Sequence, residues 1–219
     1  DRMKPHIQIL KQERGRSVRI HRLDSGATQT VKSWRFTPWF AFKFLTGIAQ
    51  PWRHLRGARR ILRSSLRTPD VLSIRIGWSS PWPVVRLRMP YVDGITALEW
   101  LKSGSNALHP LASGLGVHAA TLAKCGLRHR DFKLSNVVIE DGTRNIWLID
   151  PVGVVRDSDP SRSLACMLER LNVEIEHGLA GSVDGLQSLR RLTLLSALRP
   201  LEPARRRAVL RRLRRHPRR

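Results

Sequence analysis

Residues 129–136, HRDFKLSN, place an aspartate and an asparagine five positions apart in an arginine-rich chain of 219 residues. Two short apolar segments follow, NVVIE and NIWLI, joined by the turn DGTR, and Asp150 comes directly after the second. This pattern predicts a β-hairpin that folds Asp150 back beside Asn136. Their oxygen atoms would then face one hard cation such as Mg²⁺. Asp131, on the loop before the hairpin, would project into the same cleft.

These residue types suit phosphoryl transfer. The reaction needs a lysine on the nucleotide phosphates, oxygen ligands for Mg²⁺ and a carboxylate that orients the acceptor hydroxyl. The pattern HRD-x-K-x-x-N, followed by a strand pair and an aspartate, resembles the catalytic core of the protein-kinase-like superfamily. The resemblance implies an α+β, bilobal kinase-like fold. Its N-terminal lobe would be a small antiparallel β-sheet with one helix, and its C-terminal lobe would be mainly helical.

The strands and helices predicted for the rest of the chain also fit a fold of two lobes. Segments of strand character, separated by turns, predict a three-stranded antiparallel meander followed by two more strands. Apolar residues at helical spacing predict a helix in the basic segment 53–66. From Ile95 onward the pattern favours helices, apart from the hairpin. We therefore expect a nucleotide-binding lobe over residues 1–90 and a catalytic lobe over residues 91–219, which ends in a basic helix or tail.

Within the superfamily, three features are similar to the bacterial lipopolysaccharide-core kinases, the heptose and Kdo kinase group. They are the meander ILKQERGRSVRIHRLDSGATQTVKSWR, the basic helix ending in RTPDV, and D-x-x-G in place of D-F-G. The resemblance covers about residues 7–175. It implies an ATP- and Mg²⁺-dependent kinase that phosphorylates a sugar hydroxyl of a lipopolysaccharide or glycolipid precursor.

The resemblance also implies roles for single residues of the motif. Asp131 would orient or deprotonate the acceptor hydroxyl, and Lys133 would neutralise the γ-phosphate. Asn136 and Asp150 would hold Mg²⁺. The two residues before Asp131, His129 and Arg130, are expected to brace the loop.

The N-terminal lobe departs from the kinase pattern. Lys32 on the third strand would contact the α- and β-phosphates, but no glutamate occurs between Arg14 and Leu98 to pair with it. His54 stands near the position of that glutamate, and a histidine is no carboxylate counter-ion. We still expect Lys32 to lie across the cleft from Asp150. The glycine-rich loop is reduced to Gly15 as the nucleotide-binding glycine, with Arg14 and Arg16 as candidate side-chain contacts.

The net charge of the chain limits the classes of partner that it is expected to bind. Lys and Arg number 40 against 17 Asp and Glu, a net charge of +23 that attracts polyanions of any kind. We expect ATP, an anionic glycolipid or sugar acceptor and an anionic inner-membrane surface as partners. Nucleic acid is not expected, because no recognised nucleic-acid motif accompanies the arginines. Two cysteines without metal spacing, and no apolar stretch long enough to span a bilayer, predict a cytoplasmic protein, peripheral on the inner face of the inner membrane.

Several alternatives stay open. The missing glutamate and the thin glycine loop fit a pseudokinase that serves as a binding or scaffolding module. A protein-serine/threonine kinase-like enzyme is another, although the absence of an A-P-E-like segment after Asp150 favours a small or glycolipid acceptor. The aromatic segment 34–52, mixed with basic residues, suits either a membrane interface or the core of the lobe. The C-terminal arginines suit either an anionic membrane or a solvated helix face.

Overall fold

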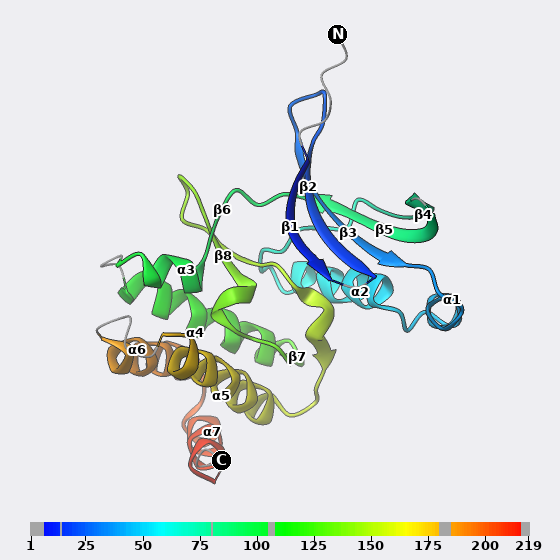
Figure 1. The fold of residues 1–219 in the computed structure, drawn as a ribbon. Helices are drawn as coiled ribbons and strands as arrows, with labels where there is room; N and C mark the ends of the chain where they lie inside the picture. Colours follow the sequence, from blue (N-terminus) through cyan, green and yellow to red (C-terminus); the bar gives the residue numbers. More distant parts are fainter. Residues whose placement is uncertain (1–6, 14, 80, 105–107, 180–184, 216–219) are drawn as a thin grey trace.

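The computed structural model describes residues 7–13, 15–79, 81–104, 108–179 and 185–215, and one antiparallel sheet dominates its N-terminal part (Figure 1). The first three strands form the predicted meander, and the last two extend it at the β3 edge. The sheet order is β1-β2-β3-β5-β4. Its members are β1 (Ile7–Glu13), β2 (Arg16–Arg22), β3 (Thr28–Arg35), β4 (Ser73–Ser79) and β5 (Trp82–Pro90).

Two helices follow β3 where one was predicted. The basic segment forms α2 (Gln50–Arg63), as expected, but the aromatic residues before it form a separate helix, α1 (Pro38–Leu45). The side chain of Thr37 accepts a hydrogen bond from the Phe40 N–H at 3.2 Å, and Pro38 starts the first turn. The prediction of one helix in this lobe was wrong, because the Thr-Pro pair starts a second helix in the aromatic segment, for which the sequence pattern predicted no helix.

The C-terminal part contains a three-stranded sheet, a two-stranded sheet and a layer of helices (Figure 1). After Pro90 the chain crosses through residues 91–93 to β6, and the lobe boundary at 90/91 stays a prediction. The short elements are β6 (Gly94–Thr96), β7 (Leu127–His129), η1 (Leu134–Asn136), β8 (Val137–Glu140), β9 (Ile146–Leu148), η2 (Pro151–Gly153) and β10 (Val154–Arg156). The helices are α3 (Ala97–Lys102), α4 (Leu108–Lys124), α5 (Pro160–Gly178), α6 (Leu186–Leu198) and α7 (Pro203–Arg215).

The main hydrophobic core lies in this part and is built on α4, which stays helical through Gly114 and Gly116. Glycine weakens isolated helices, yet here it permits close packing. A Cβ added at Gly116 would lie 2.4 Å from the Thr193 carbonyl oxygen of α6. The core continues into α7, where Val209 is fully buried. Among the described residues, no helix is both long and apolar enough to cross a membrane.

Candidate active site

The predicted hairpin is confirmed and brings the ends of its strands together. β8 and β9 pair in antiparallel register, with Val137 opposite Leu148. The N–H of Ile149 donates to the Asn136 carbonyl at 3.0 Å. Asp150 is the next residue, so it leaves the sheet beside Asn136.

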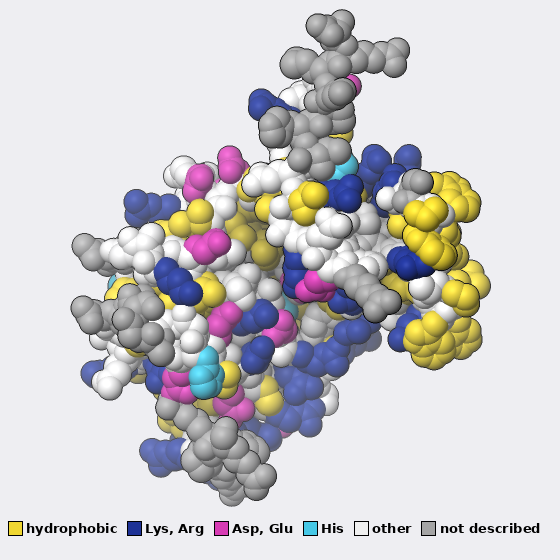
Figure 2. All heavy atoms as spheres, viewed as in Figure 1, with side chains coloured by type: hydrophobic (Ala, Val, Ile, Leu, Met, Phe, Trp, Pro, Cys, Tyr) yellow, Lys and Arg dark blue, Asp and Glu magenta, His cyan; other side chains and the backbone are white. Residues whose placement is uncertain are grey.

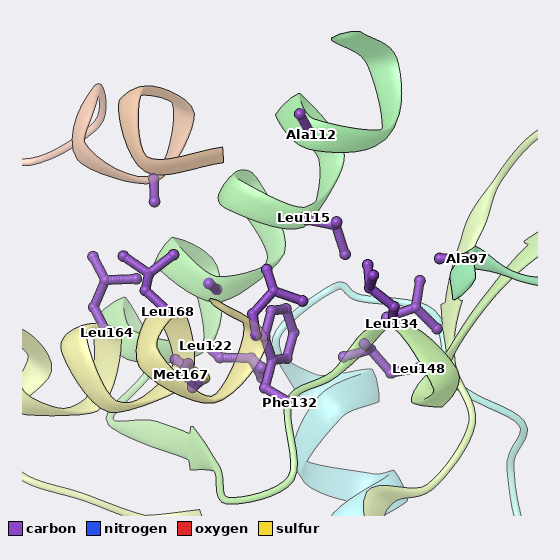
Figure 3. Close-up of a cluster of buried hydrophobic side chains, with 14 of the residues drawn as sticks. Ala97, Ala112, Leu115, Leu122, Phe132, Leu134, Leu148, Leu164, Met167 and Leu168 are labelled. Atoms are coloured by element: carbon purple, nitrogen blue, oxygen red, sulfur yellow. The ribbon is translucent and has the colours of Figure 1, made fainter. Parts of the chain in front are cut away.

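The loop HRDFKLSN is held by its apolar members. Phe132 and Leu134 are 1% and 0% exposed, and Figure 3 shows them among the buried side chains of the core. Asp131 and Lys133, which alternate with them, keep side-chain exposures of 41% and 26%. Burial of every second residue therefore fixes the loop and leaves the two polar side chains partly exposed.

Asp131 is surrounded by donors. Its Oδ2 lies 3.1 Å from Lys133 Nζ and accepts a hydrogen bond from Asn136 Nδ2 at 3.2 Å. Its Oδ1 accepts from Nη2 and Nε of Arg170 at 3.0 and 3.1 Å. Partial burial acts to raise the pKa of Asp131, but hydrogen bonds from Lys133, Arg170 and Asn136 outweigh it and hold the pKa below its ordinary value. The carboxylate is therefore ionised at neutral pH and can accept a proton.

Helix α5 supplies two contacts to this loop that sequence reasoning missed. Arg170 holds Asp131, and Glu174, one turn later, accepts hydrogen bonds from Ser135 Oγ at 2.6 Å and from the Ser135 N–H at 3.2 Å. The two residues are spaced i, i+4, which places them on one side of a helix. That spacing was the available signal, but it also fits an ordinary solvated helix face.

Lys32 lies across the cleft from Asp150, as expected. Its Nζ is 3.2 Å from Asp150 Oδ1, and its side chain is only 18% exposed. Burial acts to raise the pKa of Asp150, but the charge of Lys32 and its hydrogen bond outweigh that effect, and the pKa lies below its ordinary value. The two residues therefore form an ion pair at neutral pH.

His54 on α2 takes the place beside this pair where a glutamate would be expected. It is completely buried, and its Nδ1 is 3.9 Å from Asp150 Oδ1. Burial first, and then the charge of Lys32, lower the pKa of His54 to about 3, against the opposing effect of Asp150. His54 is therefore neutral at pH 7 and provides no counter-ion, so the charge that stabilises the Asp150 carboxylate there is that of Lys32.

Helix α2 is fastened to the segment that follows Asp150. Gly57 packs so closely that a Cβ there would lie 1.9 Å from the Pro151 carbonyl oxygen. Arg53 and Arg60 donate to the carbonyls of Val152 at 3.4 Å and Val154 at 2.8 Å. The basic face of the helix thus positions His54 against Asp150.

His129 and Arg130 connect the HRDFKLSN loop to its surroundings. His129 is buried, and its Nδ1 accepts a hydrogen bond from the Asp131 N–H at 3.2 Å. Burial lowers its pKa against the attraction of Asp150 and Asp131, so the ring is neutral. Arg130 donates its backbone N–H to Gly153 of the D-x-x-G motif at 3.0 Å, while its side chain is exposed.

A cavity of about 260 Å³ opens beside the Lys32–Asp150 pair. Its polar lining includes Lys11, Glu13, Arg16, Lys32, Gln50 and Asp150. Gly15 is not part of this lining. It forms the tight turn between β1 and β2 with φ +80°, and its carbonyl accepts a hydrogen bond from the Arg35 N–H at 2.8 Å. Arg14 lies outside the described residues.

The chemistry of Asn136 and Asp150 fits Mg²⁺. Asn136 uses its amide nitrogen to hold Asp131, which leaves its carbonyl oxygen as an acceptor. Among the described residues, no donor contacts Oδ2 of Asp150. The same part of the chain contains no group of three or more His, Cys, Asp or Glu suited to a metal. One carboxylate and one amide oxygen are still enough for Mg²⁺ when substrate phosphates and waters complete the shell.

Comparisons with known proteins agree with this description at the level of the fold. No protein-family model and no curated protein match the sequence. A solved structure of WaaP in complex with acyl carrier protein matches with a TM-score of 0.61 and 15% sequence identity. The match covers 95% of this chain and 86% of that one. The chain has a kinase-like fold. The fold class predicted from HRDFKLSN and the hairpin is therefore confirmed.

Proposed function

We propose that this chain is a kinase that transfers the γ-phosphate of ATP, with Mg²⁺ as cofactor, to a hydroxyl group. One arrangement carries the proposal. Lys32 faces Asp150 at 3.2 Å, and Asp131, with Lys133 at 3.1 Å, lies on the loop that leads into the hairpin. Lys32 would bind the α- and β-phosphates, and Asn136 and Asp150 would hold the metal. Mg²⁺ would neutralise charge on the transferring phosphates.

The described residues support the following steps. The acceptor hydroxyl gives its proton to the ionised Asp131 while its oxygen bonds to the γ-phosphorus. The bond from that phosphorus to the β–γ bridging oxygen breaks, and ADP leaves. Lys133, whose Nζ is 3.1 Å from Asp131, would neutralise charge on the transferred group. Arg170 and Asn136 keep the Asp131 carboxylate oriented during the transfer.

We further propose that the acceptor is a sugar of a lipopolysaccharide or other glycolipid precursor. The sequence resemblance to lipopolysaccharide-core kinases and the fold likeness to WaaP point in the same direction. A net charge of +23 favours a polyanionic acceptor. The enzyme would work in the cytoplasm at the inner face of the inner membrane, where such precursors are presented. The WaaP structure contains acyl carrier protein, so we also propose an acyl carrier protein as a partner, to be tested by co-purification.

The test is transfer of label from γ-labelled ATP to a lipopolysaccharide-core acceptor carrying heptose and Kdo. Label on the sugar that requires both Mg²⁺ and Asp150 supports the proposal. The alternative is a pseudokinase, favoured by the neutral His54 in place of a glutamate. It is distinguished by thermal unfolding with ATP, with and without Mg²⁺. Absence of any Mg²⁺-dependent stabilisation would favour the scaffold.

A further inference from the structure

Helix α1 exposes an apolar side. None of its eight residues is buried, and Trp39, Phe42 and Leu45 are 64%, 54% and 84% exposed. Residues spaced by three lie on one side of a helix, so these three face solvent together. The other side is anchored, because Phe40 and Phe44 contact Phe36 with ring centroids 6.2 and 6.1 Å apart. The exposed side is therefore held in place from behind, and its Trp39 and Phe42 rings stack on each other with centroids 5.6 Å apart.

The exposed side of α1 continues onto the ends of β4 and β5. The Phe36 N–H donates to the Pro83 carbonyl at 2.8 Å, which holds the start of α1 beside the start of β5. Figure 2 shows hydrophobic side chains gathered at this end of the molecule, over α1 and the ends of β4 and β5. We call this surface the aromatic patch, and its exposed members are Trp39, Phe42, Leu45, Ile48, Ile76, Trp78 and Trp82. Strand register puts Ile76 and Trp78 on the Lys32 side of the sheet and Trp82 on the opposite side, so the patch wraps around the end of the sheet. Large contiguous apolar patches on soluble proteins usually mark an interaction site.

Basic side chains lie directly against the aromatic patch. The guanidinium carbon of Arg35 is 3.3 Å from the centroid of the Trp82 ring, and Lys43 Nζ is 4.7 Å from that of Trp39. Figure 2 shows Lys and Arg side chains beside the hydrophobic ones at this end. An aromatic ring beside a cation is suited to the headgroup region, where one end is apolar and the other is polar.

The outer face of the sheet adds a second set of charges. Pairing in register places Arg19 and Arg88 on either side of Val31, and Arg86 beside Arg75. Partners across antiparallel strands share a face. We call this surface the basic face, and its members are Arg19, Arg35, Arg75, Arg86 and Arg88. It points away from Lys32, which lies on the opposite side of β3.

The charges of the basic face are not compensated. None of its five arginines forms an ion pair with a carboxylate of the described residues. A groove of about 500 Å³ runs along it, and Glu13, which also lines that groove, is paired with Lys11 at 2.7 Å. Burial, and then the charges of Arg19, Arg88 and Arg86, lower the pKa of His21 on the same face. The field of this surface is therefore positive and suits anions.

We propose that the aromatic patch and the basic face together dock the protein on an anionic phospholipid bilayer. The aromatic patch enters the headgroup and upper acyl region, and the arginines contact lipid phosphates. Charge complementarity selects this occupant, because an apolar patch alone would serve any protein partner. A patch with Arg35 against Trp82 and Lys43 against Trp39, next to a face of unpaired arginines, matches a phosphate-bearing interface. This surface would hold the protein at the membrane location included in the proposed function. Membrane binding holds or fails independently of phosphoryl transfer.

The test is sedimentation of the full chain with vesicles of phosphatidylcholine and phosphatidylglycerol at 3:1, or of phosphatidylcholine alone. The triple variant Trp39→Ser/Phe42→Ser/Leu45→Ser should bind the mixed vesicles at least about tenfold more weakly than the wild type. Leu195→Ser, 54% exposed on α6, is the matched control and should bind normally. If the triple variant fails to fold, Leu45→Glu, at the most exposed of the three positions, takes its place.

A charge comparison separates docking from general attraction. Arg75→Glu/Arg88→Glu should weaken binding to the mixed vesicles at least tenfold more than Arg207→Glu/Arg211→Glu, which changes the same number of exposed arginines on α7. Equal losses from the two pairs would overturn the proposal. The proposal would also be overturned if the patch variants bound the mixed vesicles as tightly as the wild type does. This holds even if those variants lose a co-purifying protein. Thermal stabilisation by Mg²⁺ and ATP, measured in parallel, reports the nucleotide site separately.

Discussion

The ammonium of Lys32 lies 3.2 Å from the carboxylate of Asp150, 118 positions later in the chain, and no glutamate takes part in the contact. If Lys32 binds the nucleotide phosphates, as proposed, the kinase pattern would pair it with a glutamate of the following helix. Here Lys32 pairs instead with Asp150, the predicted metal ligand, and the neutral His54 lies beside this pair. ATP and Mg²⁺ would therefore have to divide this pair, with the phosphates taking Lys32 and the metal taking Asp150.

Lys32→Met should lower phosphoryl transfer by about a hundredfold or more, because the positive charge at the phosphates is lost. It should also raise the pKa of Asp150, since burial would then act without the charge that now outweighs it. Single-turnover rates from labelled ATP measure the first effect. The exposed Lys102→Met is the control. An unchanged rate in the Lys32 variant would remove this residue from the site.

His54 should make the protein less stable in acid. Its folded-state pKa is about 3, whereas an unfolded histidine titrates near its ordinary value of 6.5. Between these pH values the unfolded chain binds a proton that the folded chain does not, so unfolding becomes easier as pH falls from 6.5 toward 3. The effect is on the order of a few kcal/mol. Urea unfolding from pH 7 to pH 4.5 should show a shallower pH dependence for His54→Phe than for the wild type. The exposed His109→Phe serves as the control, and parallel curves for wild type and His54→Phe would contradict the prediction.

Gly57→Ala should separate α2 from the segment after Asp150. The new Cβ would lie 1.9 Å from the Pro151 carbonyl oxygen, a contact that only movement of the backbone relieves. We expect a loss of about 1–3 kcal/mol in the free energy of unfolding and weaker nucleotide binding. Gly178→Ala on α5 meets only side-chain atoms, the nearest at 3.3 Å, and should change stability by less than about 1 kcal/mol. Similar stability for the two variants would show that α2 does not need this close approach.

Arg170 is a positioning residue for Asp131. Removing it in Arg170→Ala should let the pKa of Asp131 rise toward its ordinary value, because one of the groups that lower it is gone. The acidic limb of the rate profile should then move to higher pH, and transfer at pH 7 should fall by about tenfold. Arg170→Lys should restore part of both effects, and the exposed Arg191→Ala on α6 should show neither. A lower rate with an unmoved pH profile would point to a structural role instead.

The parts of the fold predicted correctly depend on residues close in sequence. The hairpin joins Asn136 to Asp150 through a short turn, and the meander places Lys32 by simple strand alternation. Such local patterns specify both the element and the face that a residue occupies.

The parts that were missed depend on contacts between distant segments. Arg170 reaches Asp131 across 39 positions, and nothing in the α5 segment distinguishes it from the other exposed arginines. Gly57 has meaning only beside Pro151, and the glycines of α4 only beside their packing partners. Glycine is unfavourable in an isolated helix, whereas tertiary packing at these positions of α4 requires residues without a side chain. Helix α1 was missed although it begins with a capped turn, because its run of aromatic residues shows no clear helical periodicity.

The most direct measurement is single-turnover transfer from labelled ATP to a lipopolysaccharide-core acceptor by the wild type and by Asp131→Asn. Asp141→Asn, in the exposed hairpin turn, is the matched control. The kinase account predicts that Asp131→Asn transfers phosphate at least about a hundredfold more slowly, while it still gains thermal stability from Mg²⁺ and ATP. The control should match the wild type. Transfer at the wild-type rate by Asp131→Asn would contradict the account.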